Sequence, residues 1–379
     1  MIQVIEVNNE AQIKEFALLP YKLYKGNEFW VPPLLKGEIN SITPGKNKMA
    51  EGCSCKFWIA QKDGETVGRI GAIVHHRYNK KTGQKVGRFT RPEFIDDAEV
   101  VDKLFEAAEK WLSEQGMEAF SGPLGFSNID TQGLLVEGFD QLASIASVYH
   151  LPYYKDHIER LGYEKLEDWV EFNLFIDEVP EKAERMFEMI QKRYGLRVES
   201  LKKSEQIEEY AHEIFHLLNK SFDDLFSFVE FNDCMIDEIV ESYKPVINPK
   251  LVHLVFNSDN KIVGFIIPVP SLSRSMQKAN GKLSLKSMLS IKYSRTHNDI
   301  VDLFLTGVDP EYQSKGVAGL LIAATQKVML KYGMTTVDTT GMLETNQKAI
   351  QHWKNYRHVQ NKRKRCYIKK NNKSFGIIK

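Results

Sequence analysis

The chain has few cysteines, no long apolar run and almost no net charge, and each shortage excludes a class of protein. Four cysteines among 379 residues cannot build a disulfide framework, so the sequence predicts a cytoplasmic protein. No apolar run reaches the length of a membrane span, and we expect no signal peptide, no anchor and no membrane partner. A net charge of +1 argues against attraction of the whole chain to nucleic acid.

The cysteines also fail to predict a metal site. Cys53 and Cys55 form the only close pair, and the adjacent His75 and His76 are the histidines nearest to them in the chain. Zinc needs four converging ligands, whereas adjacent residues on a strand point to opposite faces. We therefore expect two unreactive thiols and no metal.

What the chain does contain is an internal repeat at a shift of about 195 residues that later grows to about 217. The matching blocks are residues 2–17 with 196–211, 59–70 with 255–266, and 107–117 with 324–334. In each copy the pattern predicts a strand, a helix, a hairpin and then alternating strands and helices. Three matches in the same order indicate a true repeat.

The repeat predicts an α/β fold made of two tandem domains, each a mixed central sheet flanked by helices. We place the N-terminal domain at 1–178, a connecting helix at 179–195 and the C-terminal domain at 196–379. The connecting helix is expected to begin near Pro180 and to stop at Gly195, because proline suits a first helical turn and glycine a helix end.

One stretch of the second copy predicts a strand, a loop and a long helix. Residues 301–308 indicate a buried strand, and apolar spacing from Val317 indicates a helix that Gly333 closes. The loop precedes the helix where the first amides lack partners, and this end of the helix dipole favours a phosphate. Gly316 and Ala318 would let a ligand approach the backbone. An ordinary strand-to-helix turn explains the same spacing.

Two motifs of this half resemble those of the GNAT acyltransferase superfamily. The first is similar to its acetyl-coenzyme A signature and reads Val308-x-Pro310-x-Tyr312-Gln313-x-x-Gly316-x-Ala318. The second, Asn346-x-x-Ala349-Ile350-x-x-Trp353, resembles the motif of the penultimate helix of that family. With the hairpins and the repeat, the resemblance extends over nearly all the chain as a tandem pair of GNAT-like domains.

The resemblance implies acetyl-CoA as donor substrate and an amine as acceptor, without a metal. The strand end would bind pantetheine through its main chain, the loop would surround the pyrophosphate, and the second motif would contact the pantetheine arm. The implied donor-binding residues are Thr306, Gly307, Val308, Gln313, Ser314, Lys315, Gly316, Val317, Ala318, Gly319, Asn346 and Trp353.

The catalytic groups depart from the family pattern. The family often has a tyrosine, acting as general acid, where this chain has Trp353, and an indole N–H is not a practical acid. Tyr356 follows three residues later, on a neighbouring face of the expected helix, and is our candidate acid. Arg357 stands where the family usually ends that helix with glycine. Glu344 is the candidate base, although a glutamate before a helix also compensates the helix dipole.

The first copy lacks the loop chemistry of the second. In the alignment Asp96 takes the place of Gln313, and Glu99 takes the place of Gly316. Acidic side chains repel a diphosphate and are ordinary at the start of a helix. We therefore predict that the first copy does not bind coenzyme A.

Two basic segments allow more than one interpretation. Residues 271–295 contain six Lys or Arg, seven Ser and no acid, and form either a solvated insertion or a wall of the substrate cleft. Residues 357–373 contain eight Lys or Arg. Stacking aromatics are nearly absent there, so we do not expect nucleic-acid binding and predict a solvated edge strand.

The leading hypothesis is an acyl-CoA-dependent N-acyltransferase, specifically one that transfers acetyl, with the acceptor between the two copies. The absence of a tyrosine at Trp353 favours an alternative, a non-catalytic coenzyme A-binding sensor or scaffold. A third hypothesis is an aminoacyl-tRNA-dependent peptidyl transferase, against which the intact loop argues. The sequence leaves open the acceptor and the oligomeric state, a homodimer included.

Overall fold

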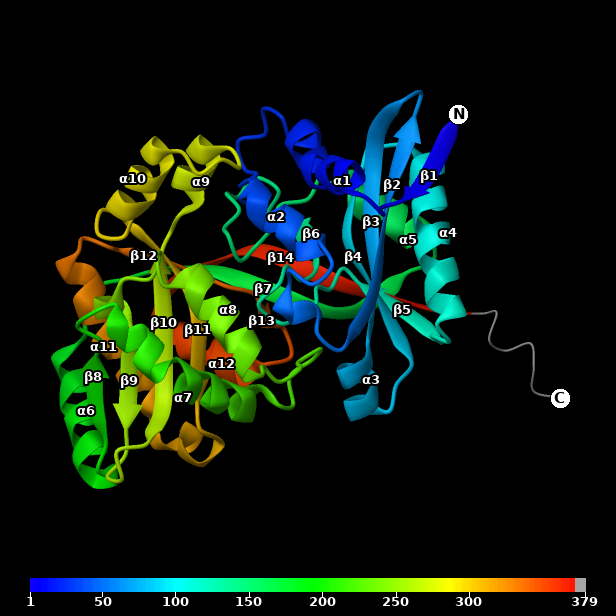
Figure 1. The fold of residues 1–379 in the computed structure, drawn as a ribbon. Helices are drawn as coiled ribbons and strands as arrows, with labels where there is room; N and C mark the ends of the chain where they lie inside the picture. Colours follow the sequence, from blue (N-terminus) through cyan, green and yellow to red (C-terminus); the bar gives the residue numbers. More distant parts are fainter. Residues whose placement is uncertain (372–379) are drawn as a thin grey trace. The chain divides into compact units, whose positions relative to one another are not determined.

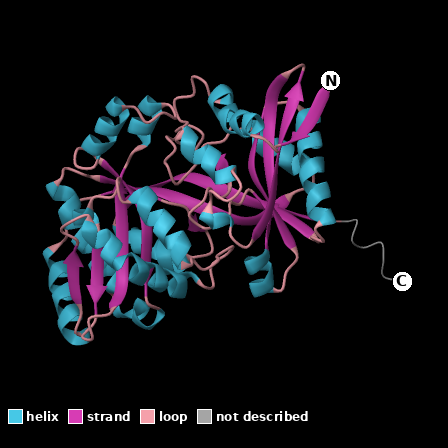
Figure 2. Cartoon of the chain, viewed as in Figure 1, coloured by secondary structure: helices cyan, strands magenta, loops and turns pink. Residues whose placement is uncertain are grey.

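The computed structural model describes residues 1–371, except for the side chains of residues 354 and 355. It divides into two compact units. Unit 1 comprises residues 1–170, 276–284 and 361–371, and unit 2 comprises residues 171–275 and 285–360. Figure 1 labels their elements, and Figure 2 shows helices flanking the strands of each unit. The two packing units thus have different bounds from the domains that we inferred from the repeat. Those domain bounds remain a prediction about the repeated sequence.

Unit 1 is built on a sheet with the strand order β1-β2-β3-β4-β5-β14, to which β6 is added beside β14. Its strands are β1 (Ile2–Glu6), β2 (Cys53–Lys62), β3 (Glu65–His75), β4 (Val86–Phe94), β5 (Ala119–Gly122), β6 (Leu134–Glu137), the start of β7 (Glu164–Phe175) and the end of β14 (Arg357–Lys370). Its helices are α1 (Glu10–Leu23), α2 (Leu35–Ile42), η1 (Lys48–Ala50), α3 (His76–Thr82), α4 (Ala98–Glu114) and α5 (Tyr153–Arg160).

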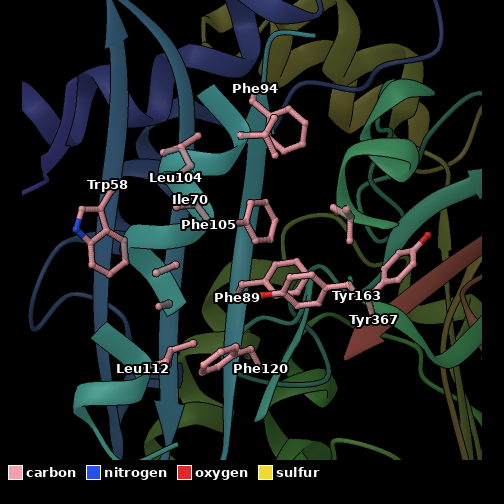
Figure 3. Packing of buried hydrophobic residues seen from close by; sticks show 14 of the residues in the cluster. Trp58, Ile70, Phe89, Phe94, Leu104, Phe105, Leu112, Phe120, Tyr163 and Tyr367 are labelled. Carbon is pink, nitrogen blue, oxygen red and sulfur yellow. The ribbon is translucent and has the colours of Figure 1, made fainter. Parts of the chain in front are cut away.

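The core of unit 1 forms where α4 packs against β2, β3 and β4. Asp97 caps this helix by accepting from the amides of Glu99 and Val100, so the acids predicted to be ordinary capping residues include a true N-cap. Phe89, Phe105 and Tyr163 meet with ring centroids 5.2–5.5 Å apart in edge-to-face contacts. Figure 3 shows these rings beside the other buried side chains of the cluster.

The prediction that residues 357–373 form a solvated edge strand is wrong from residue 361 to 370, whereas residues 357–360 are exposed and Lys373 lies outside the described residues. β14 pairs with β5 from Tyr367 to Lys370 and also pairs with β6. Its Lys362 and Lys364 are only 3% and 4% exposed. The fully buried Asp168 of β7 accepts hydrogen bonds from Arg363 and Arg365. A carboxylate nearly two hundred residues away thus compensates the charge of these two arginines.

Unit 2 is built on a sheet with the order β7-β12-β11-β10-β9-β8. Its strands are the end of β7, β8 (Arg197–Ser200), β9 (His253–Phe256), β10 (Ile262–Pro270), β11 (Ile300–Val308), β12 (Thr336–Thr339) and β13 (Met342–Leu343). Its helices are α6 (Glu181–Tyr194), α7 (Glu205–Phe222), α8 (Asp233–Tyr243), η2 (Pro249–Leu251), α10 (Leu285–Ser294), η3 (Pro310–Lys315), α11 (Val317–Lys331), α12 (Gln347–Gln351) and η4 (His352–Asn355). α9 (Ser273–Ala279) begins in this unit.

The two sheets repeat one another, as the sequence predicts. The order β1-β2-β3-β4-β5 of unit 1 returns as β8-β9-β10-β11-β12 in unit 2. In each, a long helix joins two parallel strands, α4 between β4 and β5 and α11 between β11 and β12. The connecting helix predicted after Pro180 is α6, which ends at Gly195 in the left-handed conformation.

Candidate functional site

Strand β11 changes its pairing halfway along its length. Against β10 the register shifts between Ile267 and Pro268, so β11 carries one extra residue, Phe304, as a β-bulge. Against β12 the parallel pairing stops at Leu303 within the described part of the chain. The main chain of residues 304–308 is therefore a strand edge to which an extended ligand can hydrogen-bond.

The three strand residues predicted to bind the donor lie on this edge. The hydroxyl oxygen of Thr306 is buried and has no hydrogen-bond partner among the described residues. Gly307 is required by packing, because a Cβ there would lie 2.5 Å from the Phe265 ring. The Val308 oxygen already accepts from the Ser221 hydroxyl at 3.1 Å. A ligand on this edge would therefore bind through the main chain rather than through these side chains.

The predicted phosphate loop forms a single turn before α11. It consists of η3 and of Gly316, which adopts a left-handed φ of 78°. No side chain caps the helix at Gly316, so the first amides of α11, from Val317 onward, are not satisfied by a cap. Gln313 and Ser314 are exposed beside them. The amides and the helix dipole at this turn favour an anion.

Helix α6 gives a second reason for the glycines of this turn. A Cβ on Gly316 would lie 2.8 Å from Ile190, and one on Gly319 would lie 2.9 Å from Phe187. Both contacts come from α6, so close helix packing alone requires small residues there. Lys315 extends over the Tyr312 ring at 4.0 Å, a cation–π contact that holds the ammonium beside the loop.

The second motif adopts a geometry that the sequence does not reveal. Asn346 caps α12, and its side chain accepts from the Ala349 amide at 3.2 Å. After Gln351 the helix tightens into η4, and the chain leaves it at Tyr356 in an extended conformation. Trp353 and Tyr356, expected on different helical faces, consequently line the same cavity with ring centroids 6.4 Å apart.

That cavity lies within unit 2; it encloses about 30 Å³ and opens into a wider space of about 370 Å³ that includes solvent. It is lined by β10, β11, β12, α11 and the segment around η4. The lining residues are Ile176, Ile266, Pro268, Val301, Leu303, Ile322, Thr325, Gln326, Met329, Val337, Trp353 and Tyr356. None of the residues 313–319, and neither Glu344 nor Asn346, is in this lining.

Every polar side chain of the lining is already hydrogen-bonded within the protein. Thr325 lies 3.1 Å from a ring nitrogen of His253. The Trp353 indole donates to the sulfur of Met342. Tyr356 donates to the Oε1 atom of Gln326 at 3.0 Å, and the amide nitrogen of Gln326 donates to a main-chain oxygen. The cavity therefore presents a carbon surface, which suits an apolar occupant.

The two candidate catalytic residues lie in different surroundings. Burial raises the pKa of Tyr356, so its phenol stays protonated at neutral pH and can donate a proton. Glu344 lies half-buried in the turn before α12, where its main-chain oxygen accepts from the Gln347 side chain at 2.9 Å. Tyr356 lines the cavity, whereas Glu344 does not.

Sequence reasoning missed the cavity residues of α11. Ile322, Thr325, Gln326 and Met329 follow helical spacing, which predicts an ordinary core stripe. The available signal was Thr325 and Gln326, two polar residues that are 4% and 5% exposed on a largely apolar helix. Buried polar groups on an apolar stripe indicate specific partners.

Residues 211–356 match the acetyltransferase (GNAT) family, and this range holds the bulged strand, the loop and α11. The match identifies this range of the chain as a GNAT domain. The resemblance seen in the two motifs is thereby confirmed. A tandem GNAT protein from the clavulanic acid biosynthesis pathway has the same fold, with a TM-score of 0.54, 10% identity and coverage of 98% of both chains.

Two proteins of known sequence are similar to this chain over most of its length. Protein YghO of Escherichia coli is 27% identical over 348 residues, which cover 89% of this chain and 87% of that protein. The bacterial ceramide synthase of Caulobacter vibrioides is 25% identical over 364 residues, which cover 93% and 92%.

Proposed function

We propose that this GNAT protein transfers a long acyl chain from acyl-CoA to the amine of an amphiphilic acceptor. The observation that carries this proposal is the apolar cavity, whose polar lining groups are all hydrogen-bonded to the protein. Acetyl, the donor group expected from the motifs, would gain little from such an apolar lining. A longer chain would gain about 0.8 kcal/mol of transfer free energy for each methylene that it buries.

The order of features along β11 supports the same donor. The anion-binding turn follows Val308, the open strand edge spans residues 304–308, and the cavity begins at Leu303. About 17 Å of extended strand separates Val308 from Leu303. A coenzyme A thioester bound along this edge, with its diphosphate at the turn, would direct its acyl group toward the cavity.

The similarity to a bacterial ceramide synthase supports the acceptor. That name describes a protein that makes an amide from a long-chain amine, and the similarity extends over 93% of this chain. We propose a sphingoid base, such as sphinganine, as the acceptor. Its amine would attack the thioester carbonyl, the C–N bond would form and the C–S bond would break.

Three groups of this chain are proposed to assist the transfer. Main-chain N–H groups at the Phe304 bulge would stabilise the oxyanion. Glu344 remains our candidate for accepting a proton from the ammonium of the acceptor, so that the neutral amine can attack, and Tyr356 would give its proton to the departing thiolate.

Calorimetry with coenzyme A on the wild type and on Ser314→Glu tests the donor site. Ser314 is exposed at the turn, so a carboxylate there repels the diphosphate without disturbing the core. We expect at least about tenfold weaker binding, or 1.4 kcal/mol. Ser258→Glu, which adds the same charge at another exposed position of unit 2, should bind as the wild type does.

A transfer assay with sphinganine and either acetyl-CoA or hexadecanoyl-CoA completes this test. The proposal requires faster turnover of hexadecanoyl-CoA. Faster acetyl transfer would contradict the long-chain assignment. Binding of coenzyme A without turnover of any amine would favour the sensor, and the absence of binding would refute the donor site.

Tyr356→Phe tests the proton donor. We expect kcat to fall by about 10²-fold with an unchanged KM for the acyl-CoA, because the phenol acts only as the thiolate departs. Burial raises the pKa of Tyr356. In the wild type, ionisation of this phenol should therefore cause no loss of activity between pH 7 and the ordinary tyrosine pKa of about 10. Tyr332→Phe, at the end of α11, is the matched control. An unchanged kcat in Tyr356→Phe would show that the hydroxyl serves only to hold Gln326.

A further inference from the structure

Helix α10, in the segment that is rich in serine and lysine, has its apolar side chains on the outside. Leu285, Met288, Leu289 and Tyr293 are 75%, 55%, 59% and 62% exposed. They recur at intervals of three or four residues and so form one stripe along the helix. We call these four residues the α10 stripe.

The polar side of α10 is directed inward. Ser287 is only 6% exposed. Ser290 and Ser294 each lie 2.9 Å from the hydroxyl of Ser275 on α9. An ordinary surface helix buries its apolar side and exposes its polar side. α10 does the reverse, so its serines attach it to the protein and the α10 stripe remains without a cover among the described residues.

The charge around the stripe has one sign. Residues 271–295 contain six Lys or Arg and no acid, a local charge of +6 in a chain whose total is +1. Lys286 and Lys292 are exposed on α10 itself, and Arg274, Lys278 and Lys282 are exposed elsewhere in the segment. The composition of the whole chain hides this concentration of charge.

We propose that α10 docks on a bilayer surface that contains anionic lipids. The α10 stripe would enter the boundary between headgroups and acyl chains, and Lys286 and Lys292 would meet lipid phosphates. In the described part of the chain no helix is long and apolar enough to cross a membrane, so the helix would lie on the surface. The whole-chain expectation of no membrane partner does not account for this local feature.

The charge favours a membrane over the other apolar partners. A second copy docked through the same stripe would bring two segments of +6 together, at an electrostatic cost. Nucleic acid would match the charge, but it offers no place for Leu285, Met288 and Leu289. An anionic bilayer complements both the charge and the apolar stripe. The inference does not depend on the proposed transfer reaction, although a membrane would supply its amphiphilic substrates.

Flotation with vesicles tests the proposal, using phosphatidylcholine alone and phosphatidylcholine mixed with phosphatidylglycerol. The wild type should float with the mixed vesicles and bind the neutral ones far more weakly. Leu285→Ser/Met288→Ser/Leu289→Ser should weaken binding by at least about 100-fold, because most of the stripe is lost. Lys286→Gln/Lys292→Gln should weaken it by about 25-fold at low salt, about fivefold per lysine.

Two control variants remove apolar or charged side chains at exposed positions outside α10. Met186→Ser/Met189→Ser removes exposed methionines from α6, and Lys202→Gln/Lys203→Gln removes two exposed lysines before α7. Both should float as the wild type does. Melting temperatures should be unchanged in all variants, because every substituted side chain is largely exposed.

Three results would overturn the inference: no binding to mixed vesicles, equal binding of the triple variant, or equal loss in the control variants. Sedimentation could also show a dimer of the wild type that is absent in the triple variant. If the wild type then bound no vesicles, the α10 stripe would serve self-association and the inference would be overturned too. Calorimetry with coenzyme A reports on the donor site separately. The α10 variants should retain the affinity of the wild type, so this proposal and the proposed function can fail independently.

Discussion

Replacing Ile322 by tryptophan is expected to reduce turnover of hexadecanoyl-CoA by about 10³-fold while leaving acetyl-CoA turnover within about twofold. Ile322 lies on α11, is half-buried and lines the cavity. An indole there would occupy space that we assign to the distal acyl chain. Displacing about five methylenes at about 0.8 kcal/mol each corresponds to that factor. Acetyl does not reach the cavity, so its transfer is spared.

The measurement is kcat/KM for acyl-CoAs of increasing chain length in the wild type, in Ile322→Trp and in Lys331→Trp. Lys331 is exposed on the last turn of the same helix, so its variant adds the same side chain outside the cavity. In the wild type each further methylene should raise kcat/KM by up to about fourfold until the cavity is full. An equal loss for every chain length would indicate a damaged fold, and no loss would show that the acyl chain lies elsewhere.

Asp168→Asn is expected to destabilise unit 1 by about 3 kcal/mol. The Asp168 carboxylate is fully buried and accepts from Arg365 through two nitrogens, at 2.9 and 3.0 Å. Arg363 donates at 2.9 Å, and Lys165 pairs with the same group. Removing one partner of a buried ion pair costs about 3–5 kcal/mol. We take the lower value because the two arginines are partly exposed.

The same group predicts a pH dependence. Burial alone would raise the pKa of Asp168, but hydrogen bonds from Arg365, Lys165 and Arg363 outweigh it and lower the pKa to about 2. The ordinary value in an unfolded chain is about 3.9. A lowered folded pKa contributes stability that is complete above the unfolded value and is lost as the pH falls from about 4 to 2.

Urea unfolding at pH 7 and at several values below pH 4.5 measures both effects. The wild type should lose stability more steeply with acid than Asp168→Asn, in which this titration is absent. Asp63→Asn removes a carboxylate whose partner, the N-terminal amino group, is exposed, and should match the wild type. Equal stability of Asp168→Asn and the wild type at pH 7 would contradict the assignment.

The strand, the loop and the long helix of the second copy are predictable because their signals are local. Apolar periodicity and the glycine at 316 each reflect neighbouring residues, and the repeat shows the strand and the helix, though not the glycine, in a second context. The tandem fold follows from the same signals. The donor residues on this segment remain a prediction for calorimetry to test.

The cavity and the position of Tyr356 are not predictable in this way. They depend on the Phe304 bulge and on the change from α12 to η4, both set by contacts between distant segments. The basic tail was misread for a related reason. Eight positive charges indicate a solvated strand, and the sequence does not reveal that the distant Asp168 lies beside Arg363 and Arg365.

The placement of β14 also determines when unit 1 can finish folding during synthesis. Its sheet needs Arg363–Lys370 beside β5 and β6, yet the ribosome makes these residues after all of unit 2. Most domains fold in the order of their translation. In this chain β5 and β6 are made early but lack their partner strand until the residues of the second unit have been made.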